Sequence, residues 1–472
     1  MSFPESQTTR ASHHVRAPAA RALGAGVALA LAACSGSENL STAASACFAN
    51  LGAPSGSSAV TIDPSSRFQT MQGFGTTERL FDDPHVTETF DQATQRAAVI
   101  PPAADQAKIL DALYGGIGLT RVRVHPDPIE PVNDNADPNV ADLSKFDFSW
   151  KGSDGYIASI KTLLPRGVTT YFASPITIEP WMNTSNPAEY AEWVIVMLRH
   201  WRDQGLEMPY YSIINEPGFT RSGIWPGTWM RDVIKILGPR LTAEGLKTKL
   251  VVPDDIDPMQ ALGRLQVILA DPAARQYVGA VAYHLYNRGG EAQVKQLAGQ
   301  YGLPIWMTEF STGSDWFQWA TIMQQLIADD GVSAVDYLWG YFGDWDTAQL
   351  IRIRVNNGAY AGFDFNKQYY VMGQYSKYVR PGAVRIGATS AQSDVKLAAF
   401  LEGSQEIVVA TNTGSQQLNV SFELGSGSCL TRVDATRTSE TEGLQALPTI
   451  TLDQSRFSAT LPAKSVTTFV GR

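Results

Sequence analysis

Eight short apolar runs, separated by longer segments of helical pattern, constrain the fold of this chain more than any other feature. The runs are rich in β-branched and aromatic residues, which favour strands, while the segments between them carry apolar residues at three- and four-residue steps, which favour helices. Eight strand–helix units in succession predict a closed (β/α)8 barrel, a TIM barrel. The expected strands are Met71–Gly75, Leu119–Val124, Thr169–Ser174, Tyr210–Asn215, Lys249–Pro253, Gly279–Tyr283, Pro304–Glu309 and Ala334–Gly340, and the expected helices include Asp105–Tyr114, Tyr156–Leu164, Ala188–Gln204, Thr228–Leu241, Ala292–Tyr301 and Trp316–Ala328.

A second domain begins where this alternation stops. After Arg380-Pro381-Gly382 the helical pattern is replaced by short alternating runs, such as Leu418–Leu424, which should bury one face of a sheet. We therefore expect an all-β sandwich domain over residues 383–472, following a barrel over residues 59–382. A short strand is expected at Val60–Asp63, before the barrel pattern begins. We assign it to the barrel, and the alternative is that it joins the sheet of the β domain.

The N-terminus has the pattern of an export signal. Three arginines precede an apolar run, Leu23–Ala33, that is too short to span a bilayer, so residues 1–33 are expected to be a signal peptide. Leu31-Ala32-Ala33-Cys34 is similar to a bacterial lipobox, which predicts lipidation at Cys34 and a flexible tether over residues 34–58. The expected location is the cell surface or the periplasm. The alternative is an ordinary signal peptide cut near Ala44-Ser45-Ala46, which would give a secreted protein without an anchor.

Charge and cysteine content limit the partners. Removing residues 1–33 takes away three arginines and one glutamate, so the net charge changes from −9 to −11, and an acidic protein is a poor nucleic-acid binder. We expect a monomer.

If Cys34 carries the lipid, Cys47 and Cys429 are the remaining cysteines, and export places them in an oxidising compartment. We predict a disulfide between them, with two buried free thiols as the alternative.

Two of the expected strands end on a glutamate. Tyr210–Asn215 leads directly into Glu216 and Pro217, and Pro217 cannot continue a strand ladder. Pro304–Glu309 is again apolar and ends on a lone carboxylate. Because all barrel strands end at the same face, the two acids should meet there. Glycoside hydrolysis requires such a pair, one carboxyl as proton donor and the other as nucleophile or base.

Four motifs occur in the order found in glycoside hydrolase family 30, and the chain resembles that family from Met71 to its C-terminus. They are Gln72-Gly73-Phe74-Gly75, Ile214-Asn215-Glu216-Pro217, Trp306-Met307-Thr308-Glu309 and Tyr378-Val379-Arg380-Pro381-Gly382. The resemblance implies a retaining enzyme with a barrel joined to a β-sandwich. It also implies that Glu216 is the acid/base, that Glu309 is the nucleophile, that Asn215 binds the 2-hydroxyl of the sugar, and that Arg121 keeps the nucleophile ionised.

Five further residues are weaker candidates for substrate binding. Trp181 and Trp339 lie at the ends of the third and eighth strands, where an indole face can stack on a sugar, although core packing is the alternative. His284 and Tyr286 follow the sixth strand, where the family places a residue that hydrogen-bonds the nucleophile. Asp127 lies between two prolines after the second strand and is expected either to bind a hydroxyl or to shape the turn.

The sequence gives no reason to expect a metal or another cofactor. The acidic run Asp254-Asp255-Ile256-Asp257 lacks the glycine and terminal glutamate of a calcium loop, so we interpret it as a solvated rim. Zinc-type Cys/His spacing, Gly-rich phosphate loops and Gly-x-Ser-x-Gly elbows are absent from the sequence.

The favoured substrate is xylan. The alternatives are a β-1,6-linked glucan or galactan, and, in another class, a non-catalytic carbohydrate-binding surface lipoprotein. After the eighth strand, Leu350–Gly358 has the pattern of an added hairpin with Arg352 and Arg354 on one face. An inward arginine face would bind a uronate side group. We favour the outward arrangement, and therefore expect activity that does not depend strictly on uronate decoration.

Overall fold

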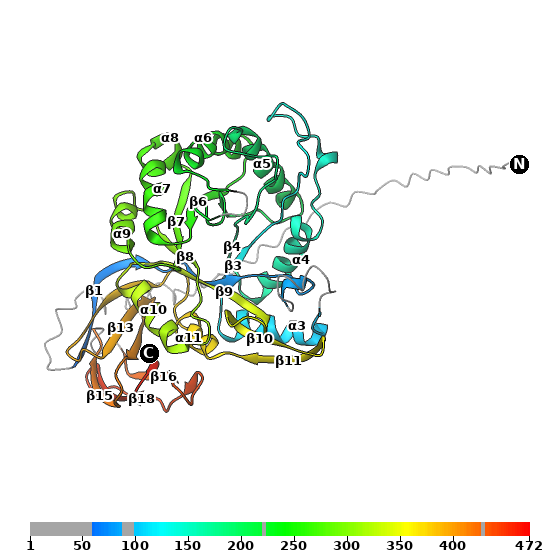
Figure 1. The fold of residues 1–472 in the computed structure, drawn as a ribbon. Helices are drawn as coiled ribbons and strands as arrows, with labels where there is room; N and C mark the ends of the chain where they lie inside the picture. The colour runs from blue at the N-terminus through cyan, green and yellow to red at the C-terminus, as the bar shows by residue number, and fades with distance from the viewer. Residues whose placement is uncertain (1–58, 87–98, 220–222, 426–429) are drawn as a thin grey trace, which may run out of the picture. The chain divides into compact units, whose positions relative to one another are not determined.

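The computed structural model describes residues 59–86, 99–219, 223–425 and 430–472 (Figure 1). Cys34, Cys47 and Cys429 lie outside these residues, as do the expected signal peptide and tether, so lipidation and the disulfide stay predictions. Among the helices in the described ranges, none has the length and apolar character needed to cross a membrane.

Eight parallel strands form the barrel. Each strand pairs with the next along the chain, and β9 pairs with both β2 and β8, which closes the ring. All eight strands predicted from the sequence are present, and the (β/α)8 prediction is confirmed. The strands are β2 (Gly73–Thr77), β3 (Arg121–Val124), β4 (Thr170–Ala173), β5 (Tyr210–Ser212), β6 (Lys249–Asp255), β7 (Val278–His284), β8 (Ile305–Glu309) and β9 (Ala334–Gly343).

Helices between the strands lie around the outside of the barrel (Figure 1). Their starts carry recognisable signals: the Asp257 carboxylate accepts a hydrogen bond from the backbone of Gln260 at the start of α7, and Asp315 does the same for α10. The helices are α3 (Ala103–Leu110), α4 (Asp154–Leu163), α5 (Pro187–Asp203), α6 (Gly227–Ala243), α7 (Pro258–Ala270), α8 (Pro272–Arg275), α9 (Glu291–Gln300), α10 (Trp316–Ala328) and α11 (Lys367–Ser376).

The barrel interior changes from apolar to charged along its axis. A small apolar cluster includes Phe172 and Trp306, and the guanidinium of Arg121 lies 4.1 Å from the centre of the Trp306 ring. Arg121 donates two hydrogen bonds of 3.0 Å to Asp336. Gly75 makes room for this pair, because a Cβ there would lie 2.4 Å from a carboxylate oxygen of Asp336. The Gly-Phe-Gly motif therefore has a packing role inside the barrel.

The all-β domain contains a second sheet of ten strands. Its first member, β1 (Val60–Thr70), precedes the barrel in sequence but pairs with β12 and β15 of this sheet. The residues of α11 connect the sheet to the barrel, since Gln374 donates a 2.8 Å hydrogen bond to Thr438 and accepts one from Thr468. The remaining strands are β12 (Val384–Ser390), β13 (Val395–Glu402), β14 (Gln405–Asn412), β15 (Leu418–Glu423), β16 (Arg432–Thr438), β17 (Gln445–Ala446), β18 (Ile450–Thr451), β19 (Arg456–Leu461) and β20 (Ser465–Gly471).

The expected hairpin after the last barrel strand is also present. It consists of β10 (Gln349–Asn356) and β11 (Ala359–Phe365), and its turn residues Asn357 and Gly358 have φ values of 50° and 74°. Asp364 on β11 pairs with Arg352 at 3.0 Å and with Arg354 at 3.3 Å, and the two arginine side chains are 44% and 46% exposed. Both arginines thus pair with one carboxylate of the same hairpin, which balances one of their two positive charges.

Candidate active site

Glu216 lies just beyond the end of β5, on a backbone held by neighbouring strands. The Asn215 N–H donates to the carbonyl of Pro175 at 2.8 Å, and the Glu216 N–H donates to the carbonyl of Asp254 at 2.9 Å. Glu216 and Asp254 have φ values of 48° and 61°, in the left-handed region that non-glycine residues rarely occupy. Such backbone strain, about 1–3 kcal/mol per residue, is typical of functional sites.

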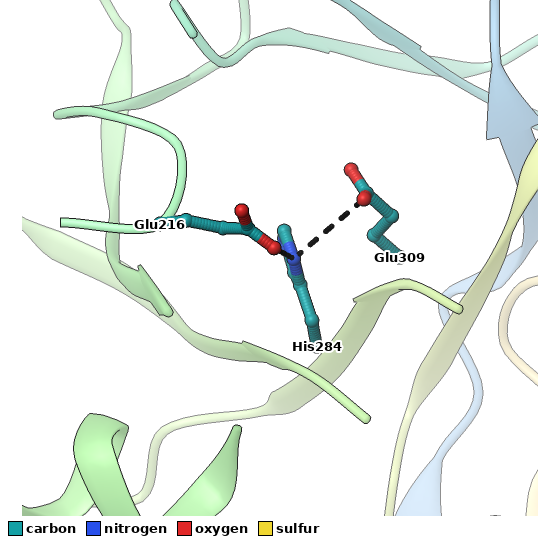
Figure 2. A group of neighbouring side chains, drawn as sticks. All are labelled: Glu216, His284 and Glu309. Carbon is teal, nitrogen blue, oxygen red and sulfur yellow. Dashed lines mark hydrogen bonds and ion pairs between the residues drawn. The ribbon is translucent and has the colours of Figure 1, made fainter. Parts of the chain in front are cut away.

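Glu216 and Glu309 meet at the C-terminal face of the barrel, with His284 between them (Figure 2). The imidazole Nδ1 is 2.8 Å from Glu216 Oε1 and 3.9 Å from Glu309 Oε1. An oxygen of one carboxylate lies within 4.8 Å of an oxygen of the other. This spacing agrees with retaining glycosidases, in which the carboxyl groups are about 5–5.5 Å apart, rather than with the about 6.5–9.5 Å of inverting enzymes.

Glu309 is buried and bonded at both oxygens. Tyr286 donates its hydroxyl to Oε1 at 2.7 Å, and Arg123 donates to Oε2. Burial by itself would raise the pKa of Glu309, but the positive charges of His284 and Arg123 hold it below its usual value. Glu309 is therefore ionised at neutral pH, as a nucleophile must be.

Arg123, and not Arg121, is the cation that contacts Glu309, which corrects the contact implied for Arg121. Side chains two apart on a strand point to the same side, so both arginines of β3 enter the barrel, but Arg123 lies one pleat nearer the catalytic face. Arg121 contacts Asp336 in the deeper layer instead. The Arg-x-Arg alternation predicts that two arginines point into the barrel, but it does not show which of them reaches the two glutamates.

The acidic run after β6 is not a solvated rim, and that interpretation was wrong. Asp254 and Asp255 are fully buried and Asp257 is 6% exposed. Each has a partner: Asp254 accepts from Arg123 at 3.1 Å, Asp255 pairs with Arg264, and Asp257 caps α7. The prediction failed because charge runs usually face solvent, whereas here β3 and α7 supply partners for the three carboxylates.

Both His284 and Tyr286 contact the catalytic pair. Burial favours the neutral form of His284, but the charge of Glu309 and hydrogen bonds to Asp254 and Glu216 raise its pKa to about 9. Burial and the charge of Glu309 raise the pKa of Tyr286, so its hydroxyl stays protonated and donates to that carboxylate. His284 acts on Glu216 more than on Glu309, judged by its two distances.

The side chain of Asn215 is oriented by Arg123. Its Oδ1 accepts a hydrogen bond from Arg123 Nη2, an orientation that the cationic donor requires. The amide NH2 of Asn215 therefore remains available as a donor, and its binding of a sugar 2-hydroxyl stays a prediction.

The other candidates have partners away from the two glutamates. Asp127 is half exposed and pairs with Lys151 at 3.5 Å, and Trp181 donates its indole N–H to the carbonyl of Glu130. Trp339 is 8% exposed, with Arg79 4.6 Å from its ring centre and Phe342 stacked at 4.9 Å. The structure thus gives Trp339 a packing role and leaves sugar stacking by it as a prediction.

The same three side chains have ligand atoms close enough for a metal ion, since Glu216, His284 and Glu309 offer atoms within 4.8 Å of one another. Their charge environment argues against one. The Arg123 guanidinium already contacts a Glu309 oxygen, and a second cation there would be repelled. The group fits acid/base chemistry better than metal binding.

Comparisons with known proteins agree with this geometry. Residues 382–469 match the glycosyl hydrolase family 30 beta sandwich domain. The chain is 27% identical to the glucuronoxylanase XynC of Bacillus subtilis over 296 residues, which is 60% of this chain and 66% of that protein. The matched region therefore spans just under two thirds of this relative's length.

Two further matches cover more of the chain. An endo-1,6-beta-D-glucanase of Aspergillus fumigatus is 25% identical over 73% of this chain and 74% of its own length. A solved structure of a glycoside hydrolase family 30 subfamily 8 xylanase from Clostridium acetobutylicum is 25% identical, with a TM-score of 0.68 over 87% of this chain and 99% of that one.

Proposed function

We propose that this chain, which belongs to glycoside hydrolase family 30, is a retaining hydrolase of a β-linked polysaccharide, with xylan as the favoured substrate. The observation that carries the proposal is the separation of the two glutamates, whose nearest oxygens lie within 4.8 Å. At that separation one carboxylate reaches the anomeric carbon directly, while the other protonates the leaving oxygen.

The reaction proceeds in two displacements. A Glu309 oxygen attacks the anomeric carbon as the bond to the leaving oxygen breaks, and that oxygen takes a proton from Glu216. Glu216, now a carboxylate, removes a proton from water, and the resulting hydroxide displaces Glu309 from the sugar. Tyr286 and Arg123 hold Glu309 in position through both steps by their hydrogen bonds to its two oxygens.

The choice of xylan rests on the relatives, because one of them is a glucuronoxylanase and another a xylanase. A β-1,6-linked glucan is the second candidate, supported by the relative named as an endo-1,6-beta-D-glucanase, and β-1,6-linked galactan is a further alternative. Pairing of Arg352 and Arg354 with Asp364 inside the hairpin supports activity without strict dependence on a uronate side group.

Product analysis tests the proposal. The protein is incubated with linear xylan, glucuronoxylan, β-1,6-glucan and β-1,6-galactan, the products are identified by mass spectrometry, and the anomeric configuration of the first product is followed by proton NMR. Oligosaccharides from xylan with retained β configuration are expected. Inverted products would contradict the mechanism, and binding without any cleavage would support the non-catalytic carbohydrate-binding alternative.

We also propose that the protein is exported and anchored by a lipid on Cys34, which the lipobox-like sequence supports. Replacing Cys34 with serine should move active protein from the membrane fraction to the soluble extracytoplasmic fraction. Unmodified protein found wholly in the soluble fraction would contradict the anchor.

A further inference from the structure

Asp254 connects both halves of the catalytic pair, although its side chain touches neither glutamate. It is fully buried at the end of β6. One carboxylate oxygen, Oδ2, accepts hydrogen bonds from Arg123 and Ser174, and Arg123 in turn bonds Glu309. The backbone carbonyl of Asp254 accepts the N–H of Glu216.

The other oxygen of Asp254 faces His284. Thr308 donates to Oδ1, and the imidazole Nε2 lies 3.5 Å from the same oxygen. Nε2 is also 3.2 Å from Arg123 Nη2. The two hydrogens of that nitrogen have better acceptors in Asn215 and in Asp254 Oδ2, so the hydrogen on His284 Nε2 points to Asp254.

The other ring nitrogen, Nδ1, determines which carboxyl oxygen of Glu216 carries the transferable proton. With His284 in its cationic form, Nδ1 also carries a hydrogen and donates it to Glu216 Oε1 at 2.8 Å. Oε1 is then an acceptor, and the transferable proton resides on Oε2, the oxygen that points away from the ring in Figure 2. As Glu216 loses its proton, the bond from His284 becomes charge-assisted on both sides and strengthens.

We propose that Asp254 is a positioning residue for the acid/base: through His284 it places a donor on Oε1 of Glu216 and leaves Oε2 to exchange the proton with the leaving oxygen. The inference rests on the proposed retaining function. It assigns to Asp254 an effect on proton transfer, in addition to its contact with Arg123.

The charges around His284 give the sign of the effect. Asp254 and Glu309 face the ring with negative charge, and Arg123 faces it with positive charge. Glu216 accepts the hydrogen of Nδ1, Asp255 lies on the strand end beside Asp254, and the Tyr286 ring packs edge-on. Removing the negative charge of Asp254 weakens the hold of His284 on its protons, so the donor that His284 presents to Glu216 is lost at lower pH.

Asp254→Asn is the test variant, because it keeps the size of the side chain and removes the charge. It should lower kcat by about 10-fold or more with little change in KM, and should move the basic limb of the kcat/KM profile to lower pH by about one to three units. Asp336→Asn is the matched control. That carboxylate is equally buried and paired with an arginine, but it lies one layer deeper, so the control should lose stability without moving the basic limb.

A basic limb that stays in place in Asp254→Asn, or moves equally in Asp336→Asn, would overturn the proposal. A second measurement needs no turnover. In protein labelled with ¹⁵N-histidine, six histidines give a small spectrum, and the His284 signals are those lost in His284→Asn. Both ring nitrogens should be protonated at pH 7 in the unmodified protein and should lose a proton at lower pH in Asp254→Asn.

A neutral His284 at pH 7 in the unmodified protein would also overturn the proposal, even if Asp254→Asn does not fold. The two failures are distinguishable. Absence of cleavage on every glycan would refute the proposed function, whereas the histidine titration reports on the link from Asp254 to His284 independently of any substrate.

Discussion

Replacing Arg123 with lysine separates the contribution of this residue to catalysis from its contribution to folding. The guanidinium bonds Glu309 through Nη1 and Asp254 through Nη2, and these two carboxylates come from different strands. A lysine ammonium keeps the charge but is a single point at the end of a flexible chain, so it reaches one of them at most.

The expected loss of activity in Arg123→Lys follows from the free energy of the hydrogen bond that the lysine cannot make. A hydrogen bond to a charged group contributes about 1.5–3 kcal/mol, and each 1.4 kcal/mol is about tenfold in rate. If the lost bond is the one to Glu309, kcat/KM of Arg123→Lys should fall by about 10- to 100-fold. Initial rates on the polysaccharide that the unmodified protein cuts best provide the assay.

Arg121→Lys is the matched control, two residues away on the same strand. It breaks the paired hydrogen bonds to Asp336 in the deeper layer, so the free energy of unfolding in urea should fall by about 1–3 kcal/mol. Its kcat/KM should stay within about threefold of the unmodified value. Equal loss of activity in the two folded variants would refute the assignment of the nucleophile's counter-ion to Arg123.

Four further outcomes are expected. Glu309→Gln should abolish turnover, while Glu216→Gln should spare an aryl glycoside whose leaving group needs no proton; equal loss on that substrate would contradict the two roles. Tyr286→Phe removes a hydrogen bond that lowers the pKa of Glu309, so the acidic limb of kcat/KM should move to higher pH, and an unmoved limb would count against the contact. Burial raises the pKa of Glu78 from 4.5 to about 7, so the folded protein binds this proton more tightly than the unfolded chain and stability falls as pH rises through that range. Glu78→Gln should remove about 2–3 kcal/mol of the difference in unfolding free energy between pH 5 and pH 8, measured in urea; an unchanged difference would exclude this origin. Arg354→Ala should leave the ratio of activity on glucuronoxylan to activity on linear xylan unchanged, because the arginine is held within the hairpin by its pairing with Asp364, and a loss confined to glucuronoxylan would show an inward role.

The candidate site was predictable from sequence wherever a residue's position along its own strand was enough. Glu216 and Glu309 end apolar strands, and barrel strands all end at one face, so their meeting needed no knowledge of distant contacts. His284 and Tyr286 were found in the same way, as residues at or just beyond the end of β7. Asp254 also ends a strand, but its acidic neighbours gave it the appearance of a surface turn.

The sequence by itself determined the architecture and the identity of the two acids. The alternation of strand and helix patterns and the change from helical to alternating patterns after Gly382 are local properties. The hydrophobic periodicity of a segment does not depend on its contacts with distant parts of the chain. The pairing of Asn357 and Gly358 as a hairpin turn is local in the same sense.

Only the tertiary structure decided which buried charges serve the acids. Arg121 and Arg123 lie on the same strand and point in the same inward direction, and they differ in depth along the barrel axis. That depth depends on the register with which β3 pairs to β2 and β4, where Arg121 aligns with Gly75 and Thr170. Register joins residues far apart in the chain, so the separation of the carboxylates and the burial of Asp254 exist only once the barrel has closed.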